Sequence, residues 1–246
     1  MEPEPEPEIE LINKRKERYF YGQNRKDGEF SNFYQCDPPF EDEQCIQFNS
    51  SEQKFMYEKV KFFEPNNSNL IRLILKETNP GKIKAYGGKR HLKTFDDKAW
   101  DKVKAHYMET ALLLKFHQNE HLKKHLLSTG NDILYEASPS DKIWGIGFGI
   151  KQALTIPKEQ YGQNLLGKTL MKVRDEIRKD EFQLKETEFK SKETDLKPRL
   201  IFELLNKDII DNNMYLQLTK VSSLDKDNID IIIQELLLYS KNKYIF

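Results

Sequence analysis

The chain has 246 residues, of which 37% are hydrophobic and 33% charged, so it is long enough to bury one sizeable core. Its 40 Lys and Arg residues equal its 40 Asp and Glu residues, which excludes the whole-chain basic field that drives unspecific nucleic-acid binding and leaves only local basic patches. Two cysteines, Cys36 and Cys45, exclude a disulfide framework and a Cys-based zinc site, and no apolar run approaches the ~20 residues that cross a bilayer. We therefore expect a soluble, cytoplasmic protein.

The chain begins with an acidic Glu-Pro repeat. Residues 1–17 lack the basic and apolar regions of a signal peptide. A charged, proline-rich segment cannot bury enough apolar surface to fold. We predict a disordered tail.

Residues 18–178 have the composition of a folded domain, with periodic apolar groups broken by Gly, Pro and Asn. One helix is predicted to begin near Ser51, because Ser50 and Gln53 form a capping-box pattern. A second is predicted over 97–117 from the spacing of Trp100, Val103, Tyr107, Ala111 and Leu114, and a third from that of Leu166, Leu170, Val173 and Ile177. Short strands are predicted over 18–21, 44–48, 133–136 and 142–146. Together these elements predict a helix-rich α+β single domain with a small β-sheet.

The last third of the chain changes character twice. Residues 179–198 alternate basic and acidic side chains, which is typical of a charged linker or a solvated helix. In residues 199–246, an apolar spacing of three and four from Ile229 to Leu237 predicts a helical C-terminal extension. No function is assigned to it.

Three motifs resemble known sites and are set aside. Residues 162–169 match the letters of a P-loop, but no buried strand leads directly into them. His117, His121 and His125 have the spacing of a helical stripe, yet no carboxylate supports them as metal ligands, so we interpret them as a solvated face. The two cysteines have no base partner in the sequence and are interpreted as reduced thiols.

A set of polar and aromatic residues remains where loops meet helices. Glu52 lies in the first turn of a predicted helix, where the macrodipole favours an ionised carboxylate. Lys59 lies two turns further along the same face, and Glu136 and Asp141 flank a tight turn that precedes Trp144. Taken alone, Glu52 is equally a capping charge or a catalyst, Lys59 an ordinary solvated charge and Asp141 an ordinary turn residue.

Four motif blocks follow one another in order over residues 19–178. They are Ser31-Asn32-Phe33; Ser51-Glu52-Gln53-x-Phe55-x-x-x-Lys59; Leu127-x-Thr129-Gly130-x-x-x-Leu134-x-Glu136-Ala137-Ser138-Pro139-x-Asp141-x-x-Trp144-Gly145-x-Gly147; and Gly162-x-Asn164-x-Leu166-Gly167-Lys168-x-Leu170-Met171-x-Val173-Arg174. Together these blocks resemble the NADAR family of YbiA-like N-glycosidases.

The resemblance implies hydrolysis of a bond between a ribose carbon and a base nitrogen, with no metal and no other cofactor. Glu52 and Asp141 are then the acidic pair and Lys59 their charge partner, because a carboxylate stabilises oxocarbenium character and accepts a proton from water. The substrate-binding candidates are aromatic or polar residues that could hold a base and cations that could hold a phosphate: Asn32, Phe33, Trp100, Glu136 and Trp144 in the first group, and Lys84, Lys89 and Arg174 in the second.

The resemblance leaves two substrates open. One is a small phosphoribosylated pyrimidine intermediate of riboflavin biosynthesis, and the other is ADP-ribosylated guanine in nucleic acid. The zero net charge favours the small molecule, because a nucleic-acid substrate needs a groove of positive potential. A module that binds ADP-ribose or a nucleotide without cleaving it stays open as a third hypothesis, and the oligomeric state is not predicted.

Overall fold

The structure is a computed structural model that describes residues 15–183. The chain divides into two compact units, Met1–Lys179 and Asp180–Phe246, so the description covers mainly the first. The predicted helical extension and most of the predicted tail and linker lie outside the described residues. Of the rest, Glu17 already belongs to a strand and residues 179–183 are helical.

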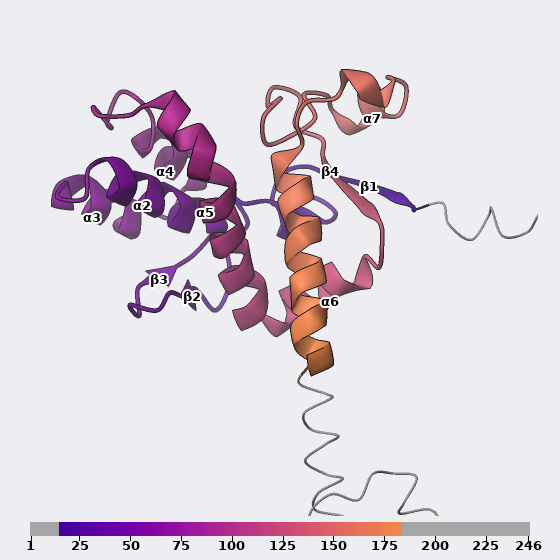
Figure 1. Cartoon of the computed structure of the whole chain (residues 1–246), viewed down its shortest axis with the longest axis horizontal. Coiled ribbons are helices and arrows are strands. Elements are labelled where there is room, and N and C mark those ends of the chain that lie inside the picture. The colour runs from indigo at the N-terminus through magenta and orange to yellow at the C-terminus, as the bar shows by residue number, and fades with distance from the viewer. Residues whose placement is uncertain (1–14, 184–246) are drawn as a thin grey trace, which may run out of the picture. The chain divides into compact units, whose positions relative to one another are not determined.

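The described part is rich in helix, as the sequence predicted, and has two small sheets where one was predicted (Figure 1). The helices are α2 (Ser51–Phe63), α3 (Ser68–Lys76), α4 (Pro80–Tyr86), α5 (Asp97–Gln118), α6 (Glu120–Ser128), α7 (Ile150–Ala153) and a further helix over residues 165–183. The strands are β1 (Glu17–Phe20), β2 (Phe40–Glu41), β3 (Gln47–Phe48) and β4 (Ile133–Glu136), and the 3-10 turns are η1 (Gly28–Phe30) and η2 (Lys158–Gln160).

Two strands far apart in the sequence form a parallel pair. β1 pairs with β4 in the register Arg18 with Leu134 and Phe20 with Glu136. Because parallel strands end at the same edge, the loops after Phe20 and Glu136 leave the sheet side by side. This edge carries the candidate site.

Helix α2 lies at the centre of the helical part and packs against α3, α4 and α5. The Ser50 hydroxyl accepts a hydrogen bond from the backbone N–H of Gln53 at 3.2 Å and so caps the helix where the sequence predicted. The Gln53 side chain also donates to the carbonyl of Ile74 at 2.9 Å, which ties the end of α3 to the start of α2. The first turn of α2 is therefore fixed from two sides.

Helix α5 matches its predicted range, and of its predicted apolar stripe Trp100 and Ala111 are buried. Its fully buried positions include Met108, Leu112 and Phe116, whereas the predicted Val103 and Leu114 are only partly buried. Lys115 is completely buried on the same face. The sequence pattern made no prediction for this lysine.

The predicted strand over 142–146 is wrong, because this segment is a loop. The Asp141 side chain accepts backbone N–H groups at its start, and Gly162 packs against the carbonyl of Lys142, where an added Cβ would lie 2.4 Å away. Close backbone packing therefore replaces strand pairing. Gly167 likewise lies against the carbonyl of Leu134, so the P-loop look-alike starts a helix packed on β4.

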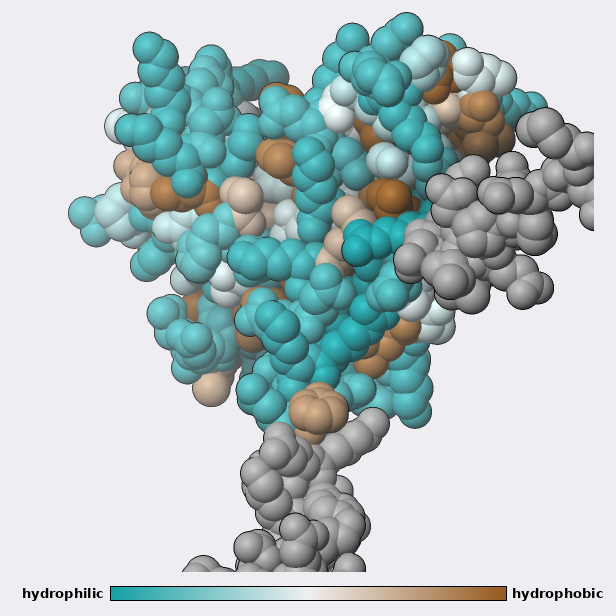
Figure 2. All heavy atoms as spheres, turned by 45° about the vertical axis from the view of Figure 1, so that its right-hand side comes forward, coloured by the Kyte–Doolittle hydropathy of each residue, from teal (hydrophilic) through white to brown (hydrophobic). Residues whose placement is uncertain are grey.

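The histidine stripe is interrupted, since α5 ends at Gln118 and α6 begins at Glu120. Within residues 15–183 no cluster of three His, Cys, Asp or Glu side chains could hold a metal ion, and no helix is long and apolar enough to cross a membrane. On the face drawn in Figure 2, hydrophobic residues form small separate groups among hydrophilic ones.

Candidate active site

A cavity of about 710 Å³ lies at the carboxyl ends of β1 and β4, next to the first turn of α2. All of the predicted site residues line it except Lys89 and Arg174. The predicted residues that it brings together are Asn32, Phe33, Glu52, Lys59, Lys84, Trp100, Glu136, Asp141 and Trp144.

Glu52 is the most deeply buried carboxyl group of the cavity, with 2% of its surface exposed. Its Oε2 accepts a short hydrogen bond from the Asn32 amide, and its Oε1 is buried with no partner among the described residues. Burial raises the pKa of Glu52 to about 7, although Lys84, the Asn32 bond and Lys59 act to lower it. The helix macrodipole favours the ionised carboxylate, but desolvation outweighs the ~1 kcal/mol that a helix terminus supplies, so Glu52 is only partly ionised near pH 7.

Glu136 is a second carboxyl group of the cavity, half-buried at the end of β4. The Asn164 side chain fixes it by accepting the Glu136 N–H at 2.9 Å and donating to the carbonyl of Leu134 at 2.8 Å. The Glu136 Oε2 is buried without a partner in the described part of the chain. Burial, together with the nearby Asp141 carboxylate, raises the pKa of Glu136 to about 7.

Asp141 has both a turn role and a place in the cavity. Its Oδ1 accepts the backbone N–H groups of Ile143 at 2.9 Å and Trp144 at 2.8 Å, which orients the loop that carries Trp144. Its Oδ2 lies 3.9 Å from the Lys84 Nζ. Because Lys84 is 58% exposed, this pair lies at the rim and leaves the ammonium accessible to a ligand.

Lys59 lies inside the cavity, and its Nζ is 3.9 Å from the centre of the Phe95 ring and 5.5 Å from that of Trp100. Burial lowers the pKa of Lys59 to about 8, while Glu52 and Asp97 act to raise it. A fraction of this amine is therefore neutral near pH 7.

The two tryptophans of the cavity differ. Phe55 lies between them, with ring centres 5.2 Å from Trp100 and 5.2 Å from Trp144. Trp100 is 6% exposed and stacks on Tyr107, so it belongs mainly to the core. Trp144 and Phe33 are only half-buried and present more of their rings to the cavity.

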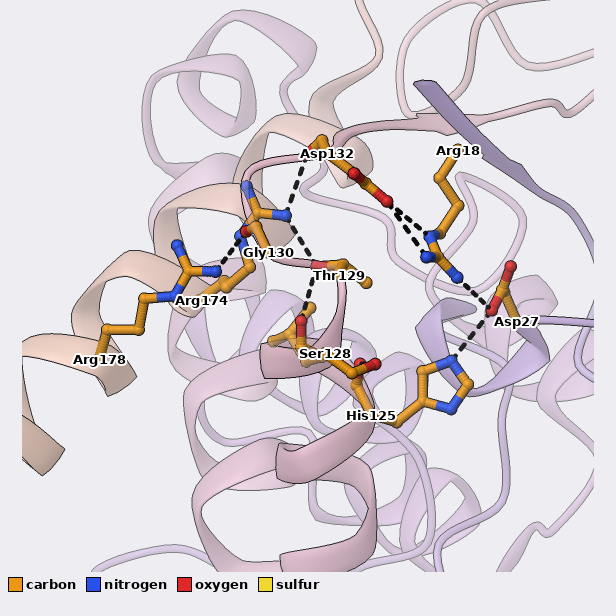
Figure 3. Close-up of polar contacts among 10 residues, drawn as sticks. Arg18, Asp27, His125, Ser128, Thr129, Gly130, Asp132, Arg174 and Arg178 are labelled. Atoms are coloured by element: carbon orange, nitrogen blue, oxygen red, sulfur yellow. Dashed lines mark hydrogen bonds and ion pairs between the residues drawn. The ribbon is translucent and has the colours of Figure 1, made fainter. Parts of the chain in front are cut away.

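Two predicted phosphate ligands do not line the cavity. Lys89 forms an exposed ion pair with Asp97 at 2.6 Å. Arg174 is buried in the 165–183 helix and donates to Thr129 Oγ1 at 2.7 Å and to the Asp132 carbonyl at 3.0 Å (Figure 3). The sequence alone does not show whether an isolated Lys or Arg will bind a ligand or donate hydrogen bonds to backbone carbonyls.

Sequence reasoning missed one face of α5 and the loop after β1. Asp97, Asp101 and Lys104 line the cavity together with Trp100, and their spacing of three and four residues could have revealed this face. Tyr21 and Gln23 also line it, and only the parallel pairing of β1 with β4 brings them there.

The cavity combines two carboxyl groups with pKa near 7, an amine with pKa near 8 and half-buried aromatic rings. Pairs of carboxyl groups whose pKa values are raised toward 7 are typical of acid–base catalysis near neutral pH. The aromatic rings suit a flat ligand, and Lys84 at the rim suits an anionic one.

Comparison with known proteins agrees with this chemistry. The model of the NADAR domain matches residues 19–178. An N-glycosidase of Acanthamoeba polyphaga mimivirus is 38% identical over 164 residues, which cover 64% of this chain and 94% of the relative. An N-glycosidase of Nostoc punctiforme is 36% identical over 50% of this chain and 70% of the relative.

A chloroplastic riboflavin biosynthesis protein of Zea mays is 31% identical over 61% of this chain, but the match covers only 23% of that longer protein. Among solved structures, the NMR structure of the E. coli protein YbiA matches with a TM-score of 0.54 and 27% identity, over 68% of this chain and 88% of YbiA.

Proposed function

Because the chain belongs to the NADAR domain family and is a hydrolase of N-glycosyl compounds, we propose that its cavity cleaves the ribose–base bond of a phosphoribosylated pyrimidine intermediate of riboflavin biosynthesis. The observation that carries this proposal is the buried Glu52 carboxyl group, with one unpartnered oxygen and a pKa of about 7, in a cavity with aromatic walls.

In this proposal Glu52 acts in its ionised form. As the C–N bond lengthens, the ribose gains positive charge, and a carboxylate in a water-poor cavity stabilises that charge more than bulk water would. The same carboxylate takes a proton from the water that attacks the ribose carbon. The Asn32 hydrogen bond supports this role, since it favours the ionised form of Glu52.

Glu136 is the complementary acid. Glu52 accepts the Asn32 hydrogen bond, which favours its ionised form, whereas the Glu136 Oε2 has no donor among the described residues. The protonated form is therefore favoured at Glu136 when the two carboxyl groups share a proton. Glu136 then gives a proton to the departing base nitrogen, and hydrolysis ends with free base and ribose 5-phosphate. Asp141 supports Glu136 by raising its pKa and by orienting Trp144.

The substrate is held at its two ends. The flat base stacks on Trp144 and Phe33, where each stacking contact contributes about 1–3 kcal/mol. The phosphate binds at the rim near Lys84, whose Nζ is exposed. The size of the cavity, about 710 Å³, suits one nucleotide.

The test is product analysis by mass spectrometry with a 5-phosphoribosylamino-pyrimidine and, separately, a DNA oligonucleotide carrying ADP-ribosyl guanine. Wild-type protein is compared with Glu52→Gln and with Glu58→Gln, a matched carboxyl-to-amide change on the same helix, where Glu58 pairs with Lys54 instead. We expect ribose 5-phosphate from the first substrate with wild type and Glu58→Gln, and none with Glu52→Gln.

Release of ADP-ribose from the oligonucleotide alone would replace the substrate with modified nucleic acid. Cleavage of neither substrate, with measurable binding of ADP-ribose, would favour the binding module and contradict the proposal.

A further inference from the structure

Lys115 lies in the last turn of α5 and outside the cavity, yet it contacts the loop that holds Glu52. It is completely buried, and its Nζ donates to the backbone carbonyl of Glu29 at 2.6 Å and to that of Ser31 at 2.9 Å. The rings of Tyr34 and Phe116 lie 5.3 and 5.2 Å from the same ammonium. No carboxylate accepts a hydrogen bond from it in the described part of the chain.

A buried lysine without a carboxylate partner is costly, because desolvation of an ammonium exceeds what two carbonyls return. Burial accordingly lowers the pKa of Lys115 to about 8. An apolar residue would fill this position of α5 at lower cost. The lysine is therefore better explained by what it holds in place.

The loop that it holds leads directly to Glu52. Ser31 precedes Asn32, and the Asn32 carbonyl accepts the backbone N–H of Glu52 at 2.9 Å and the Ser51 hydroxyl at 3.3 Å. The Asn32 amide in turn donates to the Glu52 carboxylate. The Ser31 hydroxyl also accepts the N–H of Phe33 at 3.2 Å, so the same turn sets the aromatic wall.

We propose that Lys115 is a positioning residue: its ammonium anchors the carbonyls of Glu29 and Ser31 and thereby holds the Asn32 amide on the Glu52 carboxylate. This inference rests on the proposed function, because hydrolysis is one of its readouts. It adds a residue outside the cavity that acts on the catalytic carboxylate through the backbone.

The proposal predicts a shift of the Glu52 titration. Besides Asn32, Glu52 faces Lys84 of α4, Lys59 of α2, Glu136 at the end of β4 and Asp141 in the following loop, and Lys115 faces Cys36 and Glu29. None of these groups changes in Lys115→Met, which keeps the length of the side chain and removes its donors. Loss of the Asn32 bond then raises the Glu52 titration midpoint by about one pH unit.

The experiment measures kcat/KM from pH 5 to 9 for wild type, Lys115→Met and Lys54→Met. Lys54 is the matched control, since it is also a buried lysine but pairs with Asp42 at 2.9 Å, away from the loop. We expect the acidic limb of the pH profile of kcat/KM to move up by about one pH unit in Lys115→Met. Activity then falls about tenfold at pH 6 and changes little at pH 9. Lys54→Met lowers stability and leaves the limb in place.

A second variant and a second readout keep the test decisive. If Lys115→Met does not fold, Lys115→Gln reaches one carbonyl and should give about half the shift. In an Asn32→Ala background Lys115→Gln should add no further shift, because both changes remove the same bond. Titration of ¹³C-labelled Glu carboxyl groups follows Glu52 without any substrate.

Equal loss of activity at every pH, or a shift that persists in the Asn32→Ala background, would overturn the role of Lys115. Wild-type protein that hydrolyses no substrate would overturn the proposed function instead, while the carboxyl titration would still report on Lys115.

Discussion

The polar side chains at the two ends of the parallel pair β1–β4 differ in whether they have partners. At the carboxyl ends, Glu52 and Glu136 each keep a buried oxygen without a partner and have pKa values near 7. At the opposite ends, polar side chains are paired across elements: Arg18 contacts Asp27 at 3.2 Å and Asp132 at 3.1 Å, and His125 contacts Asp27 at 3.0 Å (Figure 3). The first arrangement costs stability and provides reactivity, whereas the second joins strands, loop and helices.

The largest predicted effect on activity comes from Glu52→Gln at the first end. Removal of the carboxylate should lower kcat/KM about 10³-fold, within the range for loss of an acid–base group. Thermal melting should show no loss of stability, because a neutral amide is easier to bury than a carboxylate. A variant that keeps a tenth of wild-type activity would contradict the catalytic role.

Arg174→Met, at the opposite end, should lower stability and leave activity unchanged. It leaves Thr129 and the Asp132 carbonyl without their donor, and we expect a loss of about 3 kcal/mol in the free energy of unfolding. The folded fraction should retain wild-type kcat/KM. Urea unfolding and activity per folded molecule measure the two effects, and a selective rise in KM would return Arg174 to the list of phosphate ligands.

Trp144→Ala sharpens the picture of the cavity itself. Loss of one stacking wall should raise KM roughly tenfold, since Trp144 is half-buried at the cavity. Steady-state kinetics separate this from an effect on kcat. Trp144→Phe retains a ring and should recover most of the affinity, and equal loss in both variants would argue against stacking.

The smallest effect is expected for Lys89→Ala. Lys89 and Asp97 are 69% and 64% exposed, so their ion pair contributes at most about 1 kcal/mol and is screened by salt. Activity should stay within about twofold of wild type. A large rise in KM would show that Lys89 leaves Asp97 to bind the substrate.

The sequence predicted those features that depend on local patterns. The Ser50 cap placed Glu52 in the first turn of α2, and the spacing around Leu134 and Glu136 gave β4 with its observed bounds. The four motif blocks also identified most of the predicted site residues that line the cavity, because these residues belong to the blocks.

What the sequence missed depends on contacts between distant segments. Burial of Glu52 outweighs the helix terminus that its position suggests, and no local pattern reveals that burial. Arg174 was predicted to bind a phosphate and Lys115 was not singled out, because only the fold brings close the carbonyls that accept their hydrogen bonds. Residues 142–146 have the composition of a strand, but the backbone around Gly162 occupies the space that a partner strand would need.

The same carboxyl groups make the stability of the folded state depend on pH. Because the folded pKa of Glu52, about 7, exceeds its model value of 4.5, the folded state binds more protons than the unfolded state between these values. The stabilising contribution of Glu52 to the free energy of unfolding is thus fully present below pH 4.5 and is lost as the pH rises to about 7. Glu52→Gln should therefore gain stability relative to wild type at pH 8 and lose that gain at pH 4.

The most direct test of the account is the acidic limb of kcat/KM for wild-type protein, measured beside the ¹³C titration of the Glu52 carboxyl group. We predict one midpoint near pH 7 in both measurements, as expected for a buried carboxylate that must be ionised to act. A carboxyl group that titrates near 4.5, the ordinary value, or a rate that does not follow its titration, would contradict the claim that the buried Glu52 carboxylate catalyses the reaction.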